Sequence, residues 1–228
     1  MTSDAIATVA TSADVLRHPG AGEHLLTAVE KERAARFRHE SGRVDFIAAH
    51  VLVRLCAAAL LGVPADRAVL AQHCPDCGKG DHGKPYLPDH PGIEVSLSHT
   101  RGVVAAAAAH RPVGVDVELT GRGGTLLDVA PRVLTAEELR RVREHPDPAR
   151  AFLRLWVRKE ALIKIGRTTL DGLAGVDLSG LPLDLPGGRP QLSPFEGLQL
   201  LDWVDEAHGA AVAAVSEVPP RVVELGAL

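Results

Sequence analysis

Two acidic residues spaced two apart, Asp116 and Glu118, are the first side chains in this sequence that could do chemistry. They lie in Val113–Glu118, where β-branched residues alternate with acidic ones after an Arg-Pro pair, and this pattern predicts a strand. On a strand, residues i and i+2 share a face, so both carboxylates would project together while the valines between them pack on the other side. Such carboxylates repel each other unless a cation lies between them, and Mg²⁺ takes oxygen ligands of this kind. An exposed strand edge with ordinary surface charge would explain the same pattern.

A helix predicted over Phe152–Ile165 carries a second set of charged side chains. Its apolar residues form one arc at ~100° per residue. Lys159 lies inside that arc, where a helix that only packs would not place a lysine. Glu160 and Lys164 are four residues apart on the flank of the arc. They could form a helix ion pair worth only about 0.3–0.5 kcal/mol. They could equally serve as a third metal ligand and a phosphate-binding cation.

Together these two stretches resemble a known family. Gly114–Glu118 has the sequence G-V-D-V-E, and Trp156–Lys164 has the sequence W-V-R-K-E-A-L-I-K. They are similar to the paired signatures G-(I/V)-D-(I/V)-E and W-x-x-K-E-A-x-x-K of the 4′-phosphopantetheinyl transferases of the surfactin-synthetase type. Upstream, Gly83–Pro85 and Ser96–Thr100 extend the resemblance. It covers most of the chain and thins in the first dozen residues and after Leu170.

The resemblance implies both an activity and a fold. The family moves the 4′-phosphopantetheine arm of coenzyme A onto a serine of an acyl or peptidyl carrier protein and releases 3′,5′-ADP. The implied fold is of the α/β (α+β) class, with two similar halves related by a pseudo-twofold axis and the ligand between them. Each half would be a small, mainly antiparallel sheet packed with a long helix, with residues 1–112 binding coenzyme A and residues 113–228 binding the metal and the carrier protein. A metal-dependent hydrolase of nucleotide pyrophosphates would use the same carboxylates with water as the nucleophile.

The resemblance also assigns roles to individual residues. The metal, Mg²⁺ or alternatively Mn²⁺, would be held by three carboxylates: Asp116, Glu118 and Glu160. The catalytic residues would be Glu160, as a general base or only as a ligand, and Lys164, as the cation on the pyrophosphate. The residues expected to bind coenzyme A are Arg36, Arg43, Lys84, Pro85, Ser98, His99, Lys159 and Lys164. Of these, His99 is expected at the 3′-phosphate.

The segment between the two signatures is rich in arginine and is the expected docking surface for the carrier protein. Carrier proteins are typically acidic around the modified serine, whereas this chain has a formal net charge of -4, so attraction needs a local basic surface. The expected contacts are Arg122, Arg132, Leu134 and Arg140. A solvated helix whose glutamates balance its arginines would show a similar pattern.

Composition excludes several other classes of protein. The slightly negative charge argues against general nucleic-acid binding. No apolar run approaches the ~18 residues of a membrane-spanning helix, and the N-terminus lacks the basic and apolar regions of a secretory signal. Three cysteines, an odd number, do not make a disulfide framework. We therefore expect a cytoplasmic monomer without a membrane partner.

The region from Ala71 to Pro91 contains a Cys-x-x-Cys pair, Cys74 and Cys77, and a nearby histidine, His82. These residue types could bind zinc. The spacing lacks the second pair of a four-ligand site, and the family's chemistry does not need zinc. We therefore expect a loop with two free thiols and no metal.

The remaining pattern predicts the elements that position these residues. A long helix is expected over Arg43–Leu61, with a stripe of Arg43, His50 and Arg54 that either faces an anionic ligand or pairs with carboxylates elsewhere. Pairing is the expectation for Arg54, which lies deep in the helix. Three strands of one meander are expected at Ile93–Ser98, Val103–Ala109 and Asp116–Glu118. A helix with a capping box at Thr135–Glu138 should follow, and then two further strands at Gly197–Val204 and Gly209–Val218.

Overall fold

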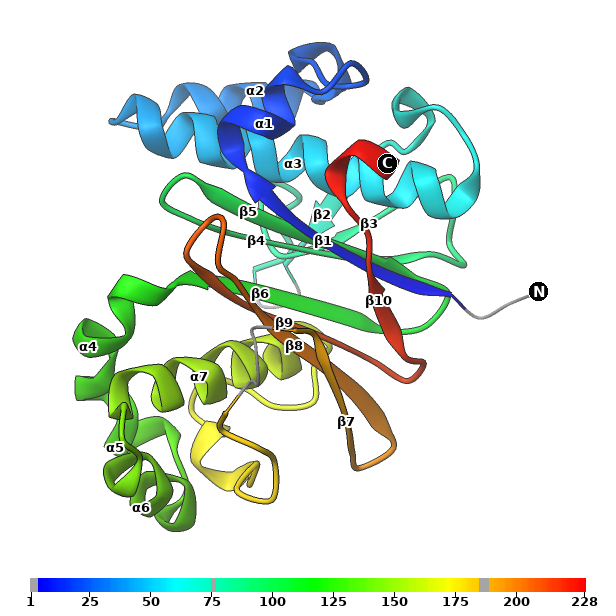
Figure 1. The fold of residues 1–228 in the computed structure, drawn as a ribbon. Helices are drawn as coiled ribbons and strands as arrows, with labels where there is room; N and C mark the ends of the chain where they lie inside the picture. Colours follow the sequence, from blue (N-terminus) through cyan, green and yellow to red (C-terminus); the bar gives the residue numbers. More distant parts are fainter. Residues whose placement is uncertain (1–3, 75–76, 185–188) are drawn as a thin grey trace.

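The computed structural model of the chain describes residues 4–74, 77–184 and 189–228. Two sheets lie face to face between two long helices, so the order of layers is helix, sheet, sheet, helix (Figure 1). The first sheet has the strand order β10-β1-β5-β4-β3-β2 and the second has the order β6-β9-β8-β7. All strand pairs are antiparallel except β1 with β10. The expected mixed α/β fold, with mainly antiparallel sheets that each pack against a long helix, is confirmed.

The described strands and helices have the following bounds. The strands of the first sheet are β1 Ala5–Thr11, β2 Ala71–His73, β3 Lys84–Tyr86, β4 Glu94–Thr100, β5 Val103–Ala109 and β10 Pro220–Val222. Those of the second sheet are β6 Val113–Leu119, β7 Gln191–Phe195, β8 Leu198–Asp205 and β9 Ala210–Ser216. The α-helices are α1 Ser12–Arg17, α2 Ala28–Ala35, α3 Glu40–Leu61, α4 Gly123–Leu126, α5 Ala130–Val133, α6 Ala136–Glu144 and α7 Pro148–Lys164.

Three apolar clusters fill the spaces between the layers. One joins α3 to the first sheet, one lies between the sheets and one joins α7 to the second sheet. Every residue of β5 is buried because α3 covers one face and the second sheet covers the other. This burial explains why a run of alanines, which favours helix by propensity, forms a strand here.

The predicted three-strand meander is wrong in its last strand. β4 and β5 pair as expected, but β6 pairs with β9 in the second sheet. β5 lies between β1 and β4, so neither of its edges is free for β6. The first residues gave no prediction, and the strand β1 that occupies this edge was therefore missed. After Pro112 the chain crosses from one sheet to the other.

The end of the chain returns to the first sheet, where β10 runs parallel to β1 (Figure 1). Thus the first sheet contains strands from both ends of the sequence. The division at residues 112 and 113 and the pseudo-twofold relation stay predictions.

The helix α3 is confirmed and lies against the first sheet. It is long and apolar enough to cross a membrane by length and composition alone, but it is mostly buried inside the protein as a core helix. Arg54 is fully buried and forms a two-pronged ion pair with Glu30 of α2, at 2.6 and 3.0 Å. The predicted pairing of Arg54 is therefore confirmed. His50 lies 3.9 Å from the same carboxylate, and burial lowers its pKa to about 4.

Candidate active site

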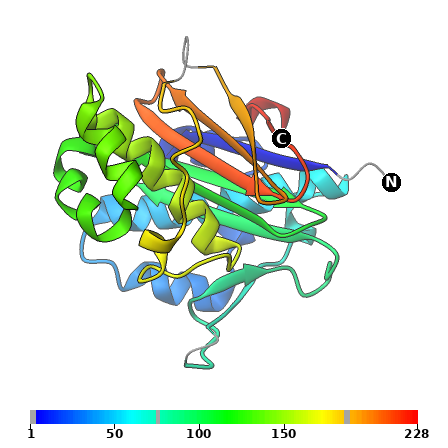
Figure 2. The same ribbon diagram turned by 90° about the horizontal axis from the view of Figure 1, so that it is seen from below.

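A close approach at Gly114 brings β6 against α7. A Cβ atom at this position would lie 2.1 Å from the backbone oxygen of Ala161, far inside van der Waals contact. Only glycine therefore permits this packing. The approach sets Glu160 and Lys164 of the helix beside Asp116 of the strand, and Figure 2 shows α7 (yellow-green) lying against the second sheet.

Asp116 is the most buried carboxylate of the predicted site, with 6% of the residue exposed. Its Oδ1 accepts hydrogen bonds from Ser98 Oγ at 2.7 Å and from Lys164 Nζ at 3.0 Å. Its Oδ2 is buried and has no hydrogen-bond partner among the described residues. Since an unsatisfied buried acceptor is costly, this oxygen is suited to a cation that the protein itself does not supply.

Glu118 and Glu160 complete the group of acids. Burial raises the pKa of Glu118, the charge of Asp116 raises it further, and Arg122 opposes both. The pKa of Glu160 is raised by burial and then by Asp116, whereas Lys164 opposes the shift. The three carboxylates are therefore close enough to repel one another electrostatically. This closeness agrees with the i and i+2 spacing on β6 and with the position of Glu160 on α7.

Three hydroxyl groups of β4 connect the two sheets at this point. Ser96 Oγ accepts from the backbone nitrogen of Val115 at 3.1 Å, Ser98 Oγ donates to Asp116, and Thr100 Oγ1 donates to Glu118 at 3.3 Å. The sequence interpretation included Ser98 only, as a coenzyme A contact. The alternation Ser-x-Ser-x-Thr, which places all three hydroxyls on one face of a strand, would have revealed the set.

Lys164 of α7 connects β4 of the first sheet with β6 of the second sheet. Its Nζ donates to the backbone oxygens of Val115 at 2.7 Å and Leu97 at 3.3 Å as well as to Asp116. The ammonium group is thus held between β4, β6 and α7, with a quarter of its side chain exposed.

A pocket of about 300 Å³ opens beside this lysine. Its lining comes from both halves of the chain and includes Lys84, Pro85, Ser96, Leu97, Ile163 and Lys164. Lys84 Nζ forms an ion pair with Glu94 at 2.7 Å and is half exposed. The structure therefore brings Lys84 and Pro85 together with Lys164, whereas Gln72 and Ile163 at the same pocket were not predicted. Another pocket, of about 240 Å³ between α7 and β8, is lined by none of the three carboxylates.

His99 lies on β4 next to Ser98, and strand alternation directs its side chain to the opposite face. Although part of this residue is exposed, loss of solvent around the ring lowers its pKa. Lys164 and Arg33 lower the pKa as well, while Asp45 opposes them. The lowered pKa favours the neutral ring, so His99 gains its charge only as the pH falls.

The other predicted coenzyme A contacts lie apart from the carboxylates. Arg36 is exposed, with its guanidinium 3.9 Å from Asp81. Arg43 pairs with Glu40 and Glu23 at the start of α3, and the hydrogen bond that it donates to Glu40 raises its pKa.

Lys159 is fully buried and does not reach the acidic group. Its Nζ forms an ion pair with Glu138 at 2.8 Å and donates to the backbone oxygens of Leu173 and Val176. This placement corrects the role suggested by the motif: the lysine holds the segment after α7 against α6. The apolar arc of α7 is buried as predicted, and Lys159 can lie within it because Glu138 neutralises its charge.

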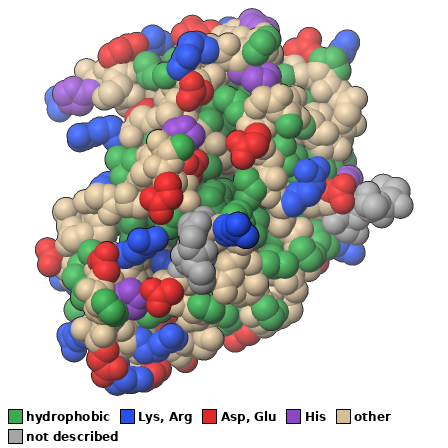
Figure 3. Space-filling view, viewed as in Figure 1, with side chains coloured by type: hydrophobic (Ala, Val, Ile, Leu, Met, Phe, Trp, Pro, Cys, Tyr) green, Lys and Arg blue, Asp and Glu red, His purple; other side chains and the backbone are tan. Residues whose placement is uncertain are grey.

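The predicted docking residues have mixed positions. Arg122 is exposed and pairs with Glu118 at 2.8 Å, so it adjoins the acidic group. Arg132 is exposed, whereas Leu134 is buried in the core around α7 and offers no surface. Arg140 pairs with Glu137 and Glu144, and Figure 3 shows charges of both signs interspersed around α4 to α6, at its lower left. At Arg140, therefore, glutamates balance the arginine charge, as in the solvated helix that was the alternative to a docking surface.

Comparisons with known proteins give a consistent result. Residues 112–216, which hold both motifs, match the model of the 4′-phosphopantetheinyl transferase superfamily. The chain is 30% identical over 161 residues to a 4′-phosphopantetheinyl transferase of Bacillus subtilis, covering 70% of this chain and 64% of that relative. It is 26% identical over 137 residues to the 4′-phosphopantetheinyl transferase Sfp of Bacillus subtilis strain 168, covering 59% of this chain and 57% of that protein. With psf-1 of Bacillus pumilus, also a 4′-phosphopantetheinyl transferase, it shares 28% over 139 residues, covering 60% of this chain and 56% of the relative.

Fold, motifs and comparisons together indicate similarity to the 4′-phosphopantetheinyl transferase superfamily, over residues 112–216 in the family model. Within that superfamily the chain resembles the Sfp-type transferases, as its motifs predicted. The matched region spans less than two thirds of the length of these relatives.

Proposed function

We propose that this protein transfers the 4′-phosphopantetheine arm of coenzyme A to a serine of an acyl or peptidyl carrier protein and releases 3′,5′-ADP. The observation that carries the proposal is the convergence of Asp116, Glu118 and Glu160 near Lys164, which also lines the pocket that contains Lys84. Carboxylates for a cation and lysines for phosphates thus adjoin one another, and the similarity to named transferases supports the reaction.

The reaction is an attack of the serine oxygen on the β-phosphorus of the pyrophosphate. A phosphorus–oxygen bond to the serine forms, the bond to the bridging oxygen breaks, and its electron pair leaves with 3′,5′-ADP. The charge on the phosphate oxygens must be neutralised for this transfer. Lys84 and Lys164, which line the pocket, would supply this positive charge.

The acidic group fits a divalent cation. Asp116 Oδ2 is the free buried acceptor, and Glu118 and Glu160 have raised pKa values that a neighbouring cation would lower. Mg²⁺ usually keeps water or phosphate oxygens among its ligands, so the three carboxylates need not all bind it directly. Mg²⁺, or Mn²⁺ in its place, would neutralise charge on the pyrophosphate.

Glu160 is the residue proposed to accept the serine proton. Burial and the neighbouring acids raise its pKa, and a bound cation would offset part of that shift, so the carboxylate would be ionised and able to accept a proton. Asp116, in contrast, is held by Ser98 and Lys164 and serves to position and to ligate.

Intact-mass measurement of a carrier protein tests the proposal. After incubation with this protein, coenzyme A and Mg²⁺, the carrier protein should gain the mass of one phosphopantetheine, and the Asp116→Ala variant should give no gain. Carrier protein that stays unmodified, while coenzyme A breaks down to 3′,5′-ADP at the same rate without any carrier, would favour the pyrophosphate hydrolase instead.

A further inference from the structure

Among the described residues, the loop between β2 and β3 holds the one group of three metal-ligating residue types whose ligand atoms all lie within 4.8 Å of one another. This group is Cys74, Cys77 and His82, and it is separate from the carboxylates. Cys74 is buried, His82 is half-buried and Cys77 is exposed, so the group lies at the protein surface with one side open to solvent. The sequence led us to expect two free thiols here.

The separation of Cys77 and His82 fits a tetrahedral metal centre. His82 Nε2 lies 3.3 Å from Cys77 Sγ. Bonds of about 2.3 Å to sulfur and about 2.0 Å to nitrogen, at a tetrahedral angle, place these two atoms about 3.5 Å apart. This pair of ligand atoms is therefore within a few tenths of an ångström of the separation that an ion would impose. Nε2 is also the ring nitrogen that faces the sulfur atoms, as a metal ligand must.

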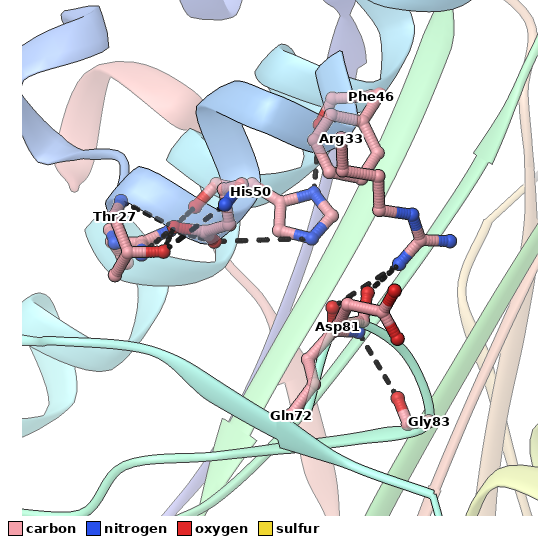
Figure 4. Close-up of polar contacts among 9 residues, drawn as sticks. Thr27, Arg33, Phe46, His50, Gln72, Asp81 and Gly83 are labelled. Atoms are coloured by element: carbon pink, nitrogen blue, oxygen red, sulfur yellow. Dashed lines mark hydrogen bonds and ion pairs between the residues drawn. The ribbon is translucent and has the colours of Figure 1, made fainter. Parts of the chain in front are cut away.

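The second nitrogen of the ring is already held. His82 Nδ1 lies 2.6 Å from Asp81 Oδ1, and this hydrogen bond is the first cause of the raised pKa of His82. A carboxylate on the far nitrogen is the usual arrangement around a metal-bound histidine, since it fixes the ring orientation and makes Nε2 more electron-rich. Asp81 is fixed in turn by Arg33, whose Nη1 donates to its backbone oxygen at 2.8 Å (Figure 4).

Backbone turns and hydrogen bonds of the loop bring His82 close to the two cysteines. Gly78, directly after the second cysteine, has φ +70° and donates to the backbone oxygen of Cys74 at 2.9 Å. At its other end, Gly83 has φ +97°, and a Cβ atom there would lie 2.2 Å from the oxygen of His73. Gln72 Nε2 donates to the oxygen of Gly83 at 3.1 Å and closes the loop (Figure 4). These contacts return His82 to the cysteines without help from a metal.

We propose that Cys74, Cys77 and His82 bind one Zn²⁺ ion through two thiolates and Nε2, with water at the fourth, solvent-facing position. Two thiolates and an imidazole suit Zn²⁺ better than Mg²⁺ or Ca²⁺, which take oxygen ligands. Binding releases the two thiol protons to solvent. The ion ties together the loop that leads directly into β3, which begins at Lys84, so it stabilises the strand that lines the nucleotide pocket.

Elemental analysis of the full-length protein, purified without added metal and without a histidine tag, tests the site. One zinc per chain is expected. The Cys74→Ser/Cys77→Ser variant should lose it, and the matched Cys56→Ala variant, which removes a buried thiol of α3 outside the loop, should keep it. Replacement by Co²⁺ should give the thiolate-to-cobalt absorption of a tetrahedral sulfur site in the wild type and in Cys56→Ala only.

One further measurement gives a result that a merely structural loop would not. Asp81→Asn keeps the ligands but weakens the hydrogen bond to His82, so affinity for Zn²⁺ should fall about 10–100-fold in a competition with a coloured chelator. The proposal is overturned if zinc added to the protein does not survive dialysis, if the double-serine variant retains stoichiometric zinc, or if the intact mass of protein purified without reductant shows a Cys74–Cys77 disulfide with no metal.

Discussion

Replacement of Gly114 by alanine tests whether the contact between β6 and α7 sets the site. The new Cβ would start 2.1 Å from the oxygen of Ala161, and contacts under 3.0 Å are essentially never seen, so strand and helix must separate by about 0.9 Å or more. The new Cβ atom is fixed to the backbone of β6 and the oxygen of Ala161 belongs to the backbone of α7, so no side-chain rotation relieves the clash. Overpacking of a buried contact typically costs about 1–3 kcal/mol. For a chain of this length, each kcal/mol lowers Tm by about 2–4 °C, so a fall of about 2–12 °C is expected.

The same shift moves Glu160 and Lys164 away from Asp116. A misplacement of about 1 Å can cost about a hundredfold in rate, so transfer should fall by about that factor at a temperature where the variant is still folded. The assays are thermal unfolding by circular dichroism and initial rates of carrier-protein modification. Gly180→Ala is the matched control, since a Cβ atom there meets nothing within 4 Å. A Gly114→Ala protein with the wild-type Tm and rate would refute the view that this close approach positions the acids.

Three further predictions address the metal, the nucleotide and the carrier protein. Asp116→Ala and Glu160→Gln should each slow transfer by about a hundredfold or more with an unchanged circular dichroism spectrum; near-normal turnover in either would remove that residue from the site. His99→Ala should weaken binding of 3′,5′-ADP, measured by calorimetry, by about 1.5–3 kcal/mol and leave binding of ADP unchanged; equal losses for both ligands would contradict the assignment. Binding of 3′,5′-ADP to the wild type should strengthen as the pH falls, because a histidine whose pKa is lowered gains its charge only in acid. Arg132→Glu/Arg140→Glu should raise the KM for carrier protein, most at low salt, with coenzyme A binding unchanged; kinetics that ignore the reversal would place docking elsewhere.

The closeness of the carboxylates could be predicted from the sequence because the evidence for it is local. The alternation in β6 sets Asp116 and Glu118 on one face, and the spacing of α7 sets Glu160 beside Lys164. Each pattern needs only the period of its own element. That the two elements meet follows from Gly114, whose lack of a side chain at a strand position is visible in the sequence but whose partner, Ala161, is not.

Pairing between distant segments was not predictable in this way. β6 pairs with β9, nearly a hundred residues later, and β1 occupies the edge of β5 that the predicted meander needed. β1 has the sequence Ala-Ile-Ala-Thr-Val-Ala-Thr and is buried nearly throughout, so it lacks the contrast of polar and apolar faces that identifies a half-exposed strand. Strands covered on both sides give this weak signal in general.

The fates of Lys159 and Lys164 show what decides the role of a cation on a helix. The two residues lie five positions apart on α7, so at ~100° per residue their side chains leave the helix in different directions. Lys159 meets Glu138, a carboxylate that also caps α6 through Thr135, and becomes part of the core. Lys164 lies at the last turn, where the helix ends beside β4 and β6, and a quarter of its side chain stays open to the pocket. Each ammonium group has a carboxylate partner, Glu138 for Lys159 and Asp116 for Lys164. It is therefore exposure, and not the motif, that separates the buried lysine of the core from the lysine open to a phosphate.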